Sequence, residues 1–170
     1  MIQLSVENIN RTAPYRVETI NELSVSFVTD NGVCYDIGFY ADTIFSIDGA
    51  YHFYISNADH KHGPNDPKVL ATVIAVIEEF FRQEPMVMLY ICDPRDNRQA
   101  ARNRLYLHWF NDYINKSDFR LYSESVMYKS VDYYAGLIMR KDNPYYDDVV
   151  ATFHQIAEML PALMIRPKSE

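Results

Sequence analysis

The chain has 170 residues, of which 48% are hydrophobic and 14% aromatic, and this composition excludes disorder and allows one continuous core. Its formal net charge of -7 argues against nucleic acids and membrane surfaces as partners, because both are bound through a positive patch. Cys34 and Cys92 lie far apart, as is typical of reduced thiols in a cytosol. With neither a leader nor a membrane-spanning apolar run in the sequence, we predict a soluble cytoplasmic protein with a single domain over residues 1–170.

The first third of the chain predicts antiparallel strands. A short strand is expected near Tyr15 to Val17, and residues Glu22 to Phe27 alternate between polar and apolar, as in a half-buried strand. The sequence Asp30-Asn31-Gly32 then favours a hairpin turn, with the return strand from Val33 to Tyr40. A further strand from Tyr51 to Ile55 completes a predicted meander of at least three strands.

Three helices share one start signal, an aspartate or asparagine followed by proline. The side chain before the proline can accept a hydrogen bond from a first-turn amide, and proline needs no donor at the first helical position. The signal occurs at Asp66-Pro67, Asp93-Pro94 and Asn143-Pro144, and the last helix is expected over roughly 145–159.

The stretch from Met86 to Cys92 is almost entirely apolar and lies between two predicted helices, which is typical of a central strand covered on both faces. Two further strands are expected at 119–128 and 133–141, joined by a turn at 129–132. The order of elements predicts an α+β fold with a mixed, mainly antiparallel sheet and helices on both faces.

Two arginines follow the central strand at an unexpected place. With 3.6 residues per turn, Arg98 and Arg102 share a helix stripe with Leu105 and Tyr106, although a helix start already carries partial positive charge. Something negative should therefore lie beside them. It could be a carboxylate of the chain, such as that of Asp93 or Asp96, or a bound phosphate, pyrophosphate or carboxylate.

Cys92 ends the central strand just before a predicted helix start, where amides and arginines could stabilise a thiolate. Its position would suit a nucleophile, but no histidine is placed by the sequence to act as its base. The alternative is a small buried apolar residue, and this is the interpretation that we favour.

The loop before the first long helix holds the second candidate site. A mixed-charge turn ahead of a helix start can bind phosphate, and the residues concerned here are His60, Lys61, His62, Gly63 and Lys68. Asp59, His60 and His62 could also hold a metal. No second ligand pair follows at a recognised interval, however, so we predict a solvated loop without a metal.

The order of elements resembles that of GNAT-type acyltransferases over residues Leu23 to Arg140. In that family the loop before the first helix cradles the coenzyme A pyrophosphate, which corresponds here to His60 through Lys68 and implies acetyl-CoA or another acyl-CoA as cofactor. The second helix of the family carries an Asn-x-x-Ala-x-x-Leu-Tyr pattern. Leu105-Tyr106 matches its end, while Gln99 and Arg102 replace the Asn and Ala. The resemblance implies Tyr106 as the general acid that protonates the leaving thiolate.

The chain is also similar to an uncharacterised family of small bacterial proteins with a Cys-Asp-x-x-Asp-x-Arg-Gln-x-x-Arg stretch, here Cys92 to Arg102. Two functions remain open. The first is acyl-CoA-dependent N-acyl transfer, retained or lost, with a small anionic ligand. The second is a non-enzymatic interaction module that contacts a protein partner or forms a homodimer on the same scaffold. A metal-dependent hydrolase that uses the His60/His62 loop ranks last.

Overall fold

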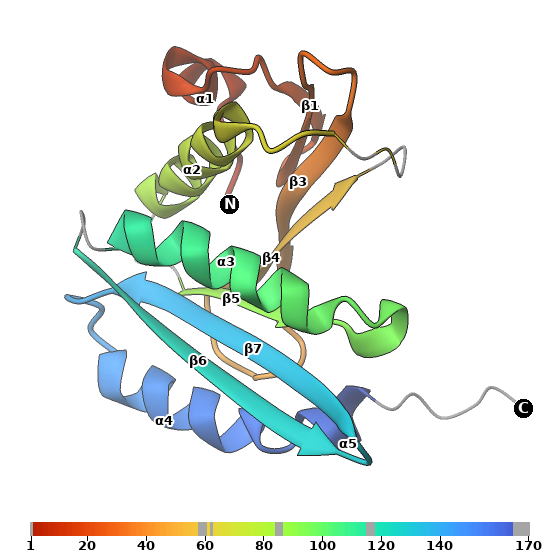
Figure 1. The fold of residues 1–170 in the computed structure, drawn as a ribbon. Coiled ribbons are helices and arrows are strands. Elements are labelled where there is room, and N and C mark those ends of the chain that lie inside the picture. Colours follow the sequence, from red (N-terminus) through yellow and green to blue (C-terminus); the bar gives the residue numbers. More distant parts are fainter. Residues whose placement is uncertain (1, 58–60, 62, 84–86, 115–117, 165–170) are drawn as a thin grey trace, which may run out of the picture. The chain divides into compact units, whose positions relative to one another are not determined.

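The fold is known from a computed structural model that describes residues 2–57, 61, 63–83, 87–114 and 118–164. These residues form one sheet with strand order β1-β2-β3-β4-β5-β7-β6, together with five α-helices and a single 3-10 turn, η1 (Figure 1). The strands are β1 (Glu18–Asn21), β2 (Ser24–Val28), β3 (Cys34–Ala41), β4 (Ala50–Asn57), β5 (Val87–Cys92), β6 (Phe119–Tyr128) and β7 (Val131–Arg140). The helices are α1 (Val6–Thr12), α2 (Pro67–Arg82), α3 (Gln99–Ile114), α4 (Tyr146–Ala157) and α5 (Leu160–Met164), with η1 at Pro94–Asp96.

The sheet is mixed and mainly antiparallel, which confirms the predicted α+β fold class. A parallel pair is formed by β4 and β5, whose register runs from Ala50 opposite Val87 to His52 opposite Leu89. The chain divides into two compact units, Met1–Tyr40 with Phe53–Met86 and Ala41–His52 with Val87–Glu170. That the whole chain acts as one domain stays a prediction. None of the described helices is both long and apolar enough to cross a membrane.

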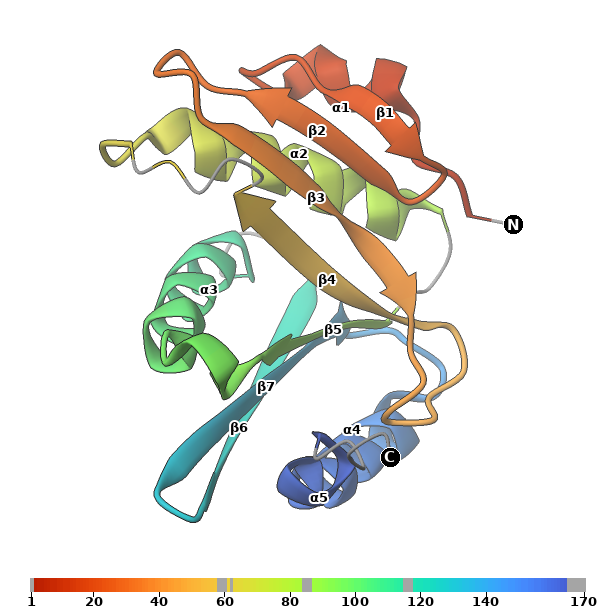
Figure 2. The same ribbon diagram turned by 90° about the vertical axis from the view of Figure 1, so that its right-hand side faces the viewer.

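In the first unit, α1 and α2 pack together on one face of the β1–β3 strands (Figure 2). The apolar stripe of α2 reaches the sheet through Phe80, whose ring stacks on Phe39 with 4.1 Å between centroids. Helix α1 was not predicted, because seven residues are too few to show a period, although Ser5 caps it by accepting a hydrogen bond from Asn8 N. The predicted strand at 15–17 is wrong, since β1 starts only at Glu18.

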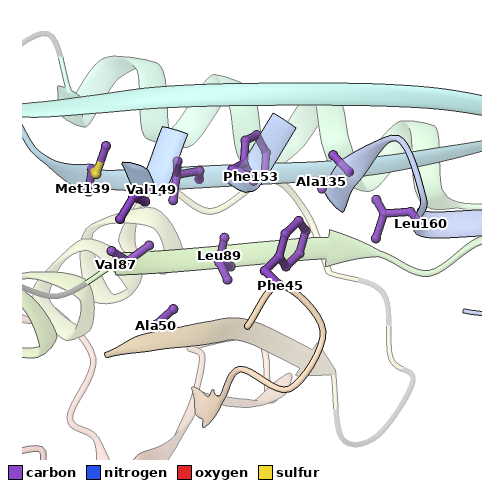
Figure 3. Close-up of a cluster of buried hydrophobic side chains, with 11 residues drawn as sticks. Phe45, Ala50, Val87, Leu89, Ala135, Met139, Val149, Phe153 and Leu160 are labelled. Atoms are coloured by element: carbon purple, nitrogen blue, oxygen red, sulfur yellow. The ribbon is translucent and has the colours of Figure 1, made fainter. Parts of the chain in front are cut away.

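In the second unit, α3 covers one face of the β5–β7–β6 strands and α4 covers the other (Figure 2). The α4 face holds a buried apolar cluster in which Phe153 stacks on Phe45 with 5.5 Å between centroids (Figure 3). The other fully or nearly fully buried members are Ala50, Val87, Leu89, Ala135, Leu137, Met139, Val149, Ala157 and Leu160. This cluster fixes the central strand that the sequence predicted.

The α3 face depends on one glycine. Gly136 in β7 lies directly opposite Tyr90 in β5, and a Cβ added at Gly136 would overlap the Tyr90 ring. The ring therefore lies across the strand where a side chain would otherwise stand. This close approach turns Tyr90 toward α3.

One of the three predicted helix starts lies further along the chain than expected. Asp93-Pro94 opens only the single turn η1, which ends at Asn97 with a left-handed φ of 56°, and α3 begins at Gln99. Asn143 caps a turn by accepting from Tyr145 N at 2.9 Å, and α4 starts at Tyr146. The hairpin turn is also shorter than predicted, because it consists of Lys129 and Ser130 alone.

Candidate functional site

The buried face of α3 holds a polar pair that the sequence did not reveal. Tyr90 OH donates to Asn103 Oδ1 at 3.1 Å, and the Asn103 residue is only 9% exposed. Burial raises the pKa of Tyr90 well above its usual value, so that this phenol stays protonated. An asparagine in the middle of a helix is usually a surface residue. Here its burial is explained by the hydrogen bond that it accepts from the Tyr90 phenol.

Tyr106, the candidate general acid, lies on the same buried face. It is 4% exposed, and its ring meets Tyr90 edge-on with 5.1 Å between centroids. The rings of Trp109 and Phe110 lie at 6.0 and 5.8 Å. Tyr106 is thus part of an aromatic cluster. A packing role in this cluster is the alternative to a role in catalysis.

The predicted stripe of α3 is rotated relative to the observed one. Among the positions of α3 whose side chains the structure describes, 99–111, the buried ones are Asn103, Tyr106 and Phe110, whereas Leu105 is 43% exposed and Arg98 is exposed. The prediction is confirmed for Tyr106 and wrong for Leu105 and Arg98, and it gave Asn103 no role. The spacing of arginines and apolar residues does not reveal Asn103, because its burial depends on the phenol of Tyr90.

Arg102 lies in an ion pair within the chain. Its guanidinium binds the Asp96 carboxylate and also donates to the Asp93 carbonyl oxygen at 3.3 Å. Asp96 in turn accepts from Arg98 N at 3.0 Å, and this bond together with Arg102 holds the pKa of Asp96 below its usual value. Asp93 is paired with Arg95 in the same way. The negative partner that the sequence demanded for Arg102 is therefore present within the protein.

Cys92 is buried, and burial raises the pKa of its thiol to about 12. A nucleophilic cysteine reacts as the thiolate, which is scarce at neutral pH for such a group. The structure agrees with the packing role for Cys92.

The start of α2 is organised by carboxylates of the chain itself. Asp66 caps the helix by accepting from Lys68 N at 2.9 Å, and it also accepts from Tyr15 OH. Lys68 Nζ lies 2.9 Å from Asp30 Oδ2 and 5.5 Å from the centroid of the Tyr15 ring. The pairing lowers the pKa of Asp30 and raises that of Lys68. Lys68, one of the predicted phosphate contacts, thus already binds the carboxylates of Asp30 and Asp66.

Of the remaining loop candidates, His60 and His62 lie outside the described residues. Lys61 is exposed and its carbonyl oxygen accepts from the Asn57 side-chain amide, while Gly63 is exposed beside Val33. Lys61 and Gly63 belong to the first compact unit, and Arg98, Arg102 and Tyr106 belong to the second. Among the described residues, no three histidine, cysteine or acidic side chains lie close enough to hold a metal ion.

A second polar cluster lies between β6 and α4. His154 Nδ1 contacts Glu124 Oε1, and the two side chains are 40% and 32% exposed. Beside them the hydroxyls of Tyr122 and Tyr146 are 2.5 Å apart, and burial together with Tyr122 raises the pKa of Tyr146 to about 12. Sequence reasoning missed this cluster because 30 residues separate Glu124 from His154.

One further pair is fully buried. His52 Nε2 lies 2.8 Å from Asp42 Oδ1, and the carboxylate also accepts from the backbone amides of Ile44, Phe45 and Ile47. Burial alone would raise the pKa of Asp42, but these hydrogen bonds lower it to about 2. Asp42 therefore orders the loop between β3 and β4.

The comparisons with known proteins define the family but not the activity. The model of a family of unknown function, DUF6169, matches residues 65–155, which is more than half of the chain. The chain belongs to the DUF6169 family. No curated protein matches it.

A solved structure that resembles the DUF6169 chain is that of a CoA-dependent acyl-homoserine lactone synthase, MesI. The two sequences are 10% identical, the match covers 85% of this chain and 75% of the other, and the TM-score is 0.37. At these values the likeness carries no argument about activity.

The DUF6169 match spans α2, β5, α3, the β6–β7 hairpin and most of α4. It therefore includes the Cys92 to Arg102 stretch noted in the sequence, as well as Tyr106 and the Glu124/His154 pair. Residues Tyr15, Asp30 and Asp42 lie before it. The capped start of α2 thus combines Asp66 from inside the match with partners from outside it.

Proposed function

We propose that this DUF6169 chain transfers an acyl group from an acyl-CoA to an amine, with Tyr106 as proton donor. The observation that supports the proposal is the order of elements β4, α2, β5 and α3, with β4 and β5 paired in parallel and Tyr106 on the helix after β5. This is the arrangement that the GNAT resemblance implied. Lys61, Gly63, Lys68, Arg98 and Arg102, with His60 and His62, are the proposed contacts to the coenzyme A phosphates.

In the proposed reaction the amine nitrogen forms a bond to the thioester carbon and the carbon–sulfur bond breaks. The Tyr106 phenol donates its proton to the departing sulfur, and the proton lost by the amine restores the phenol through water. A phenol keeps its proton at neutral pH, which suits donation to a thiolate. Because Tyr106 is 4% exposed, its hydroxyl must be uncovered when the substrate binds.

A second function is favoured by the ion pairs of the candidate residues. The first-turn amides of Lys68 and Val69 already donate to Asp66, and Pro67 has no amide to offer a phosphate. Lys68 and Arg102 each contact a carboxylate of the chain. A non-enzymatic interaction module on the same scaffold would need no other ligand for these groups.

Thermal unfolding of the intact chain with acetyl-CoA or a longer acyl-CoA separates the two functions. A ligand at about 100 times its Kd stabilises the folded state by about 2.7 kcal/mol, which should raise the Tm by roughly 5 °C or more. Lys68→Met should reduce that rise if a phosphate displaces Asp30 from Lys68. Folded protein whose Tm stays unchanged at millimolar acyl-CoA would contradict acyl transfer and leave the interaction module.

Turnover is tested with Tyr106→Phe, which keeps the ring packing and removes only the hydroxyl. We expect the release of coenzyme A thiol to fall at least tenfold, while the Tm rise with acyl-CoA is kept. Tyr145→Phe is the matched control, since Tyr145 is 69% exposed on the turn before α4. Equal turnover of the Tyr106→Phe variant and wild type would exclude Tyr106 as the proton donor.

A further inference from the structure

The strand β6 forms one end of the sheet order and lies beside β7 (Figure 1). Its ten residues pair with β7 without a register shift, from Phe119 opposite Arg140 to Tyr128 opposite Val131. The strand contains no proline. Proteins commonly protect an edge of this length with a bulge, a proline or a short strand, and β6 has none of these within its described residues.

The hairpin turn determines which backbone groups face outward. Lys129 and Ser130 both have positive φ, 51° and 64°, as in a type I′ two-residue turn. Tyr128 and Val131 therefore form a hydrogen-bonded pair, and the pairs alternate along the ladder. The even-numbered residues of β6 bond to β7, and the odd-numbered residues from Leu121 to Met127 direct their N–H and C=O groups to the open edge.

The side chains on the α4 face of β6 form an ordered row. Tyr122 contacts Tyr146 and His154, and Glu124 is held by His154. Arg120 lies near enough for its charge to act on the Tyr146 phenol. The strand thus presents one cation and one anion on the same face, four residues apart, with Tyr122 midway between them.

We propose that two copies of this chain pair through β6, antiparallel, about a two-fold axis at Tyr122. The open edge consists of odd-numbered residues, so they must pair with odd-numbered residues of the second copy. A centre at Tyr122 satisfies this and sets Arg120 opposite Glu124 of the partner subunit twice. Centres at Arg120 or Glu124 would instead set like charges opposite each other, which is destabilising.

In this register Leu121 of each copy forms a hydrogen-bonded pair with Ser123 of the other copy. The Tyr122 side chains meet in a non-hydrogen-bonded pair, where the Cα atoms are closest, at about 4.5 Å. His154 keeps Glu124 in place and occupies only Oε1 of its carboxylate. The inference does not rest on acyl transfer, since it uses only β6 and the helix beneath it.

The first test is the mass of the intact chain by light scattering and sedimentation over a concentration series. The proposal expects a dimer whose Kd rises by about tenfold in Arg120→Glu, because two attractive pairs become repulsive. The double variant Arg120→Glu with Glu124→Arg restores opposite charges and should recover the dimer. A wild-type monomer at submillimolar concentration, or no recovery in a folded double variant, would overturn the proposal.

Two further variants test the edge and the register. Ser123→Pro removes an outward N–H without removing a bond to β7, so a folded monomer is expected. Tyr122→Cys, in a chain with Cys34→Ser, should form a disulfide between copies on mild oxidation. Ser125→Cys is the control, because it and its copy would lie about 20 Å apart. A dimer that persists in Ser123→Pro, or crosslinking that is equal at both cysteines, would also overturn the proposal.

Discussion

The two long helices α2 and α3 both follow an Asp-Pro pair, yet the two starts differ. At α2, Asp66 caps the helix itself, and Pro67 is its first residue. At α3, Asp93 caps only the turn η1, and the helix begins after a left-handed residue at Asn97. The comparison shows that an Asp-Pro pair determines where the chain turns but not how far the resulting helix extends.

The buried faces of the two helices also differ in how polar they are. The α2 face is almost entirely apolar, with Thr72 and Glu79 as its polar members. Over residues 99–111 of α3, where side chains are described, the buried row consists of Asn103, Tyr106 and Phe110. Docking of α3 therefore depends on the hydrogen bond to Tyr90 as well as on apolar contact. Three sets of variants test the buried face, the helix starts and the ion pair of Arg102.

The largest effect is expected from Asn103→Ala. It leaves the buried Tyr90 hydroxyl without its acceptor, which should lower the free energy of unfolding by about 2 kcal/mol in a denaturant titration. Asn111→Ala is the matched control, because Asn111 is an exposed asparagine of the same helix. Adding Tyr90→Phe to Asn103→Ala should cost less than the sum of the single changes. Equal losses in the two asparagine variants would mean that the Tyr90 bond does not anchor α3.

The helix starts themselves give the next effect. Asp66→Ala removes the cap of a sixteen-residue helix, and we expect it to cost about 1–2 kcal/mol of unfolding free energy. Asp93→Ala should cost less, since it caps a three-residue turn. Asp66→Asn should retain most of the stability, because an amide oxygen can also cap. The contrast between the helices would fail if Asp93→Ala were the more damaging change in the same titration.

The smallest effect is expected from Arg102→Leu. Its partner Asp96 is 49% exposed, so solvent screening should limit the loss to less than about 1 kcal/mol at neutral pH. The pKa of Asp96 is lowered in the folded state, so its stabilisation is present above the ordinary carboxyl pKa of 3.8 and is lost as the pH falls through the lowered value.

Measuring the free energy of unfolding at pH 7 and near pH 3 therefore checks whether the stabilisation by the Arg102–Asp96 pair is lost in acid. The difference between wild type and Arg102→Leu should shrink on acidification. Arg104→Leu, at an exposed position of α3, should show little difference at either pH. A difference for Arg102→Leu that grows in acid would show that the pair with Asp96 is not its cause.

Much of the fold was predictable from local pattern, and the candidate site was not. The strand from Val87 to Cys92 and the strand from Phe119 to Tyr128 were predicted within one residue of their observed bounds, because burial and alternation are visible in the sequence. The predicted stripe of α3 included Tyr106 correctly but missed Asn103, whose burial depends on Tyr90. The sequence predicted that a negative group lies beside Arg102, and Asp96, which pairs with it, was one of the two carboxylates named. The proposed roles of Tyr106 and the loop before α2 stay predictions.

The sequence by itself determined the longer elements, their order and the α+β class, because these depend on the periodicity of apolar residues and on prolines and turn residues near each other in the chain. Only the tertiary structure decided which polar groups are buried and which charges are paired. Tyr15 and Asp66 are 51 residues apart, and Glu124 and His154 are 30 apart. A hydrogen bond acts over a few ångströms, so the partner of a buried polar group is known only when the fold has brought distant residues together.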